Sequence, residues 1–80
     1  MATPESIKQH IETSLPCELV HVESDDGRHF SAIIVSIEFR GKNKVQQHQL
    51  VYRALGDRMR QEIHALSMKT LTPEQWAEAH

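Results

Sequence analysis

Apolar residues recur in the first part of this 80-residue chain with a spacing of four, and afterwards with a spacing of two. The residues spaced by four are Ile7, Ile11 and Leu15. Such a spacing places side chains on one face of a helix, so the pattern predicts a helix over residues 4–14. Thr3 is its N-cap candidate, and Pro16 prevents the helix from continuing.

Two segments with alternating apolar residues follow, at residues 18–24 and 29–39. Alternation of this kind is typical of strands. In the second segment, one face would carry Ile33, Val35, Ile37 and Phe39, and the other Phe30, Ala32 and Ile34. The turn-forming sequence Asp-Asp-Gly-Arg at residues 25–28 separates the two segments. The pattern therefore predicts an antiparallel β-hairpin.

The second half of the chain returns to helical spacing. The residues four apart are Val51, Leu55 and Met59, and they predict a helix over residues 45–59. Gly56 lies inside this pattern and favours an earlier end, so the C-terminal boundary stays open. Residues 63–71 then predict a third strand. A last helix is expected from Thr72, because Pro73 suits the first helical position and Gln75 completes a capping box.

These elements give the order α-β-β-α-β-α in one small domain, residues 1–80. The predicted fold class is α+β, with a three-stranded sheet and helices packed on one face. Apolar residues make up 39% of the chain, which is enough for a modest two-layer core. No apolar run reaches membrane-spanning length, and the N-terminus has neither a basic region nor an apolar stretch. We expect a complete, soluble, cytoplasmic protein that is a monomer when free.

Charge is distributed unevenly along the chain. Residues 1–39 carry seven acidic and two basic side chains, whereas residues 40–60 carry six basic and one acidic. The six basic residues are Arg40, Lys42, Lys44, Arg53, Arg58 and Arg60. A local basic patch of this kind is either a solvated helix face or a surface for an acidic partner or nucleic acid.

Several short motifs resemble the BolA family, and together they cover about residues 5–78. They are Gly27–Phe30, Phe39–Lys42, Val45–Leu55, Ile63–Ser67 and Thr70–Trp76. The resemblance implies a fold similar to a type II KH domain. It also implies a non-catalytic partner of monothiol glutaredoxins in iron–sulfur cluster trafficking and iron homeostasis. Some members of the family are described as DNA-binding regulators of morphology and stress response.

The family's cluster-associated positions are a histidine or cysteine in the hairpin loop and a histidine before the third strand. In this chain those positions are His29 and His64. The chain departs from the family at Gln47-His48-Gln49, where many members have Arg-His-Arg. The two missing guanidinium groups weaken the expectation of nucleic-acid binding more than that of cluster binding.

Two histidines cannot complete a [2Fe–2S] cluster, which needs four ligands. A glutaredoxin with bound glutathione would have to supply the thiolates. The only cysteine of this chain, Cys17, excludes an internal disulfide and an all-cysteine metal site. Coordination requires neutral imidazole, so complex formation is expected to weaken below about pH 6.

Other interpretations remain open from the sequence. A histidine at a strand end is also commonly a polar structural residue. The basic residues of 40–60 form the alternative candidate site, which would contact DNA phosphates. No sequence motif of a catalytic triad, a phosphate loop or a zinc protease is present, so we do not expect an enzyme.

Overall fold

A computed structural model describes residues 3–62 and 65–79, with the backbone alone for residues 58–62 and 65. Three helices and three strands follow one another in the predicted order. They are α1 (Pro4–Ser14), β1 (Leu19–Glu23), β2 (His29–Val35), α2 (Lys44–Glu62), β3 (Ala65–Leu71) and α3 (Pro73–Ala79). A short 3-10 helix, η1 (Ile37–Phe39), lies between β2 and α2. The predicted α+β class is confirmed.

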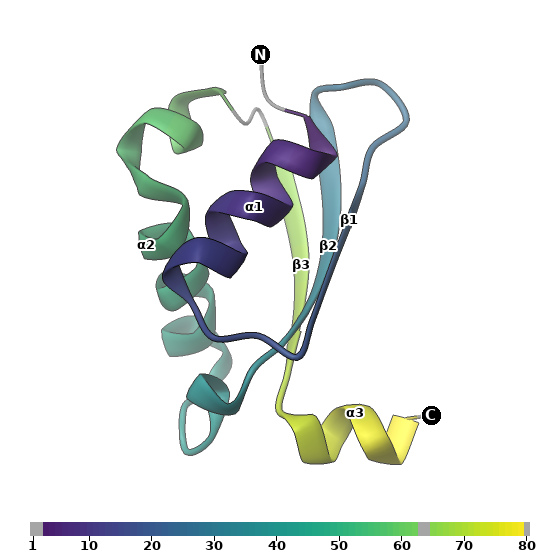
Figure 1. Ribbon diagram of the computed structural model, residues 1–80, viewed down its shortest axis with the longest axis vertical. Helices are drawn as coiled ribbons and strands as arrows, with labels where there is room; N and C mark the ends of the chain where they lie inside the picture. Colours follow the sequence, from purple (N-terminus) through teal and green to yellow (C-terminus); the bar gives the residue numbers. More distant parts are fainter. Residues whose placement is uncertain (1–2, 63–64, 80) are drawn as a thin grey trace.

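The sheet has the strand order β1-β2-β3, with β1 and β2 antiparallel and β2 and β3 parallel. The predicted hairpin is therefore confirmed. The long connection through α2 allows β3 to run parallel to β2, as a parallel pair requires. Figure 1 shows α1 and α2 beside the sheet and α3 at the end where β3 stops.

One hydrophobic core lies between the sheet and the two longer helices. Its buried members include Ile7 and Ile11 of α1, Phe30 and Ile34 of β2, and Val51 and Leu55 of α2. Full burial of a side chain of this size contributes about 1.5–3 kcal/mol. Helix α3 differs, because none of its residues is buried.

Each helix begins with a reciprocal side-chain cap, in which two side chains each accept a hydrogen bond from the other residue's backbone N–H. The pairs are Thr3 with Ser6, Asn43 with Gln46, and Thr72 with Gln75. These pairs satisfy amide groups that have no partner within the helix. The predicted caps at Thr3 and Thr72 are confirmed.

The prediction that the second strand continues to Phe39 is wrong, because β2 stops four residues earlier. Ser36 is buried, and its hydroxyl accepts a hydrogen bond from the N–H of Glu38 and donates one to the carbonyl oxygen of Pro16. These bonds begin the turn of η1 and end the ladder. Ile37 is consequently 46% exposed, although the alternating pattern placed it in the sheet.

Helix α2 is interrupted at Gly56, whose backbone has φ 79° and ψ 163°. The helical segments on either side extend beyond the predicted limits of 45 and 59, from Lys44 to Glu62. The open boundary at Gly56 thus corresponds to a kink rather than to an end. No helix within the described residues is both long and apolar enough to cross a membrane.

Candidate functional site

His29 is the first residue of β2 and follows directly on the hairpin loop. Its side chain is 64% exposed. In the parallel pairing of β2 with β3, His29 lies opposite Ala65, the first residue of β3. The predicted ligand His64 lies outside the described residues, and it precedes Ala65 in the sequence. The sheet register thus brings His29 to the end of the sheet at which β3 begins.

The loop before His29 is closed by hydrogen bonds to side chains. The hydroxyl of Ser24 accepts from the N–H of Gly27 at 2.9 Å and donates to the carbonyl oxygen of His29 at 2.7 Å. Gly27 has φ +76°, a left-handed conformation that glycine adopts readily. These bonds tie the loop to the first residue of β2.

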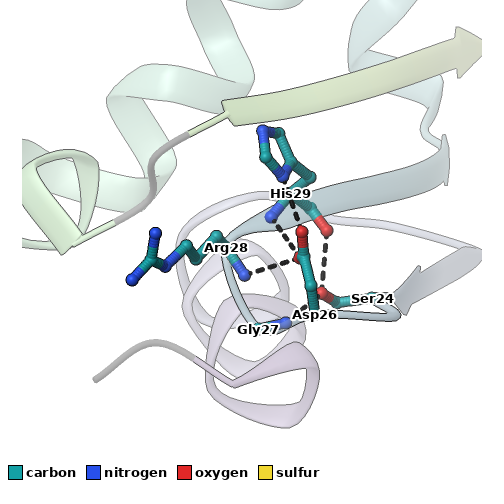
Figure 2. A network of polar contacts seen from close by, with 5 residues as sticks. All are labelled: Ser24, Asp26, Gly27, Arg28 and His29. Carbon is teal, nitrogen blue, oxygen red and sulfur yellow. Dashed lines mark hydrogen bonds and ion pairs between the residues drawn. The ribbon is translucent and has the colours of Figure 1, made fainter.

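Asp26 contacts both the backbone and the ring of His29 (Figure 2). Its Oδ1 accepts hydrogen bonds from the N–H groups of Arg28 and His29, each at 2.9 Å. Its Oδ2 lies 2.8 Å from Nδ1 of His29. The backbone bond from His29, the contact with its ring and the bond from Arg28 hold the pKa of the Asp26 carboxyl well below its usual range.

The importance of Asp26 was not predicted from the sequence, which indicated only a turn at this position. A usable signal was present. Aspartate side chains in loops often accept from the amides two or three residues further on. At Asp26 the residue three positions on is a histidine, so the same turn that closes the loop also brings a carboxylate to the imidazole.

The thiol of Cys17 is half-buried beside the core. Burial, with a contribution from the charge of Glu12, raises the pKa of this thiol to about 11. Such a thiol is protonated at neutral pH and is a poor metal ligand. Among the residues that the structure describes, no three histidine, cysteine or carboxylate side chains are grouped as a metal site.

Two of the six predicted nucleic-acid contacts are engaged within the chain. Arg40 forms a bidentate ion pair with Glu74 of α3, with N–O distances of 2.7 Å and 2.6 Å. Lys44 donates through Nζ to the carbonyl oxygen of Thr70. The ion pair raises the pKa of Arg40 and lowers that of Glu74.

The other four basic residues do not form one described group. The side chains of Lys42 and Arg53 are exposed. Those of Arg58 and Arg60 lie outside the described part of the chain. The structure therefore describes only part of the predicted basic patch and only one histidine of the predicted pair.

Comparison with known proteins places this arrangement in a family. A family profile described as BolA-like protein matches residues 5–75. The chain belongs to the BolA family.

Relatives within the BolA family span several kingdoms. The DNA-binding transcriptional regulator BolA of Haemophilus influenzae is 40% identical over 58 residues, which are 72% of this chain and 56% of that protein. Human BolA-like protein 2 is 36% identical over 77 residues, 91% of this chain and 88% of the relative. This chain spans 56–61% of the length of several curated relatives that it matches.

The fold agrees with solved BolA structures. The crystal structure of a Bol-like protein from Babesia bovis has a TM-score of 0.88 at 29% identity, and the match covers 99% of this chain and 94% of that one. The similarity in fold therefore extends over the helices and the complete sheet, including the loop before His29.

The side chain of Gln47 belongs to the interior of the fold. This side chain is only 4% exposed. Its amide nitrogen donates to the carbonyl oxygens of Phe39 at 3.1 Å and Lys42 at 2.9 Å, and its oxygen accepts from the hydroxyl of Thr70 at 2.6 Å. In this BolA chain, residue 47 therefore connects α2 to neighbouring elements.

Proposed function

We propose that this BolA protein is a non-catalytic adaptor that pairs with a monothiol glutaredoxin and shares a [2Fe–2S] cluster with it, in iron–sulfur cluster trafficking and iron homeostasis. His29 and His64 would each bind the cluster through one ring nitrogen. The glutaredoxin and its glutathione would supply the thiolates. Histidine ligands on one iron raise the reduction potential of such a cluster.

The observation that carries this proposal is the register of β2 against β3. Because His29 pairs with Ala65 across the parallel ladder, the loop histidine lies at the same end of the sheet as the residue that follows His64. Neighbouring strands are about 4.8 Å apart. Residues at the starts of β2 and β3 are thus neighbours in the sheet, although positions 29 and 64 are 35 residues apart in sequence.

The chemistry of the described donors also supports a shared site rather than a complete one. The exposed ring of His29 contacts a carboxylate, which is the usual environment of a metal-binding histidine. The thiol of Cys17 has a raised pKa and lies beside the core. A partner that brings thiolates is therefore the simplest source of the remaining ligands.

The test is visible absorption and circular dichroism of this chain mixed with a glutathione-loaded monothiol glutaredoxin that holds a [2Fe–2S] cluster. We expect a changed spectrum that is lost in His64→Ala and weakened in His29→Ala. His21→Ala is the matched control, because His21 is an exposed histidine of the same sheet. An unchanged wild-type spectrum, with no complex on a sizing column, would contradict the proposal for that partner.

DNA binding is the second candidate function, and one observation favours it. A relative that is 40% identical over 58 residues is named a DNA-binding transcriptional regulator. The engagement of Arg40 and Lys44 within the chain reduces the basic surface that remains for phosphates. The candidate contacts are then Lys42, Arg53, Arg58 and Arg60.

Salt dependence tests this second candidate. Binding to phosphates releases counterions, so the affinity for duplex DNA should fall steeply as salt is raised. Arg53→Ala should weaken binding to all sequences and lower the salt slope by about one. Lys69→Ala is the control, because Lys69 is an exposed residue of β3 outside the basic segment. An affinity for DNA that does not depend on salt, or no binding at physiological ionic strength, would contradict this second candidate function.

A further inference from the structure

We propose that Asp26 is a positioning residue that selects Nε2 of His29 as the atom that binds the cluster. This inference rests on the proposed function. It adds a residue that has no contact with the cluster itself and acts only through the imidazole.

The carboxylate of Asp26 is held by the backbone of its own loop. Its Oδ1 accepts from two consecutive amides, those of Arg28 and His29, at 2.9 Å each. Two bonds to one oxygen define the orientation of the whole group. The other oxygen, Oδ2, is thereby presented to the ring at 2.8 Å from Nδ1. The loop thus positions the carboxylate, and the carboxylate positions the ring.

The charge of Asp26 then decides which ring nitrogen carries the proton. An ionised carboxylate only accepts hydrogen bonds, so Nδ1 must be the donor in this contact. In the neutral imidazole, a proton on Nδ1 leaves the lone pair on Nε2. Nε2 is therefore the nitrogen that can coordinate a metal.

The direction of the ring agrees with this assignment. Figure 2 shows the imidazole of His29 above the Asp26 carboxylate, with its second nitrogen on the side where β3 begins. The register of the sheet places Ala65 opposite His29 on that side. A ring anchored at Nδ1 thus directs Nε2 toward the end of the sheet at which β3 begins.

Asp26→Asn is the informative substitution, because it keeps the shape of the side chain and replaces the oxygen that accepts from Nδ1 by a donor NH2 group. The amide oxygen can still accept from the two backbone N–H groups, so the loop keeps its closure. The amide nitrogen then faces Nδ1 as a donor, which favours a proton on Nε2. Asp25→Asn is the matched control, since it removes the same charge from the neighbouring residue of the loop.

The first measurement uses the free protein at pH 8 and long-range ¹⁵N–¹H correlation spectra of its histidines. His29 is assigned by comparison with His29→Gln. We expect the Nδ1–H tautomer in the wild type and in Asp25→Asn, and the Nε2–H tautomer in Asp26→Asn. The same tautomer in the wild type and in Asp26→Asn would overturn the inference, whatever the cluster experiments give.

The second measurement follows the circular dichroism of the cluster in the complex with glutaredoxin during challenge with a chelator. Loss of a residue that orients a metal ligand typically costs 10–100-fold in metal affinity. We therefore expect Asp26→Asn to lose the cluster at least about tenfold faster than Asp25→Asn. Equal rates would overturn the inference alone. Absence of any shared cluster in the wild type would instead overturn the proposed function.

Discussion

The hydroxyl of Thr70 in β3 donates a 2.6 Å hydrogen bond to the side-chain oxygen of Gln47 in α2, and both residues are buried. The amide nitrogen of Gln47 donates at the same time to two carbonyl oxygens of the preceding segment. All polar atoms of this side chain are thus satisfied. The connection fixes the beginning of α2 against β3, the strand that starts opposite His29.

Truncation of Gln47 should therefore destabilise the fold. Gln47→Ala removes the partner of the buried Thr70 hydroxyl and of the Lys42 carbonyl group, and leaves the Phe39 carbonyl with only its backbone bond from Lys42. We therefore expect a loss of about 2–4 kcal/mol in the free energy of unfolding. Gln49→Ala removes the same side chain from an exposed position of the same helix. It should change the free energy of unfolding by less than about 0.5 kcal/mol. Urea denaturation measures both. Equal effects of the two substitutions would contradict the buried role of Gln47.

The kink at Gly56 supports a second prediction. Its φ of 79° and ψ of 163° lie in a region that is essentially restricted to glycine, although an added Cβ would meet no atom within 4 Å. Gly56→Ala should cost about 1–3 kcal/mol through backbone strain alone. D-alanine at this position, introduced by chemical synthesis, adds the same methyl group without that strain. Thermal unfolding should show a loss only for the L-residue, and equal losses would contradict the explanation.

The ion pair between Arg40 and Glu74 predicts a pH dependence of stability. The pKa of Glu74 is lower in the folded chain than in the unfolded chain. The stabilisation that the ionised Glu74 carboxyl gives to the folded chain is therefore fully present above its pKa in the unfolded chain, about 4.3. It is lost as the pH falls through the lower pKa of the folded chain. Between pH 6 and pH 3, the urea midpoint of Glu74→Gln should fall less than that of the wild type. Glu78→Gln, on the same helix, should follow the wild type, and a common profile for both variants would contradict the assignment.

The raised pKa of Cys17 predicts slow alkylation. A thiol with a pKa of about 11 is about 0.1% ionised at pH 8, whereas an ordinary thiol with a pKa of about 8.5 is about one quarter ionised. Iodoacetamide should therefore react with Cys17 at least about tenfold more slowly than with glutathione, because the greater nucleophilicity of a basic thiolate offsets only part of its low population. Glu12→Gln should increase the rate, since the charge of Glu12 contributes to the raised pKa. Reaction at the rate of glutathione would show that the thiolate is available as a ligand.

Much of the fold could be predicted from local patterns. The spacing of Ile7 and Ile11 and the caps at Thr3 and Thr72 are local signals, and the structure confirms each of them. The end of β2 could not be found in this way. Ile37 continues the alternating pattern, and the strand stops because Ser36 forms a side-chain bond to Pro16, a residue 20 positions away.

The candidate site was predictable only in part. The sequence motifs indicated His29 and His64, but the register that places His29 opposite Ala65 depends on a parallel crossover. The basic segment looked uniform, whereas the structure separates Arg40 and Lys44 from the rest through contacts with α3 and β3. Such contacts join residues 26–34 positions apart, so no local pattern carries them.

Pulsed electron paramagnetic resonance shows directly whether His29 and His64 bind the cluster, as we propose. The chain would be labelled with ¹⁵N-histidine, combined with unlabelled glutaredoxin and glutathione, and its [2Fe–2S] cluster reduced. We predict strong ¹⁵N hyperfine couplings that are lost in His64→Ala, partly lost in His29→Ala and unchanged in His48→Ala. A cluster-bearing complex without strong ¹⁵N couplings would contradict ligation by this chain.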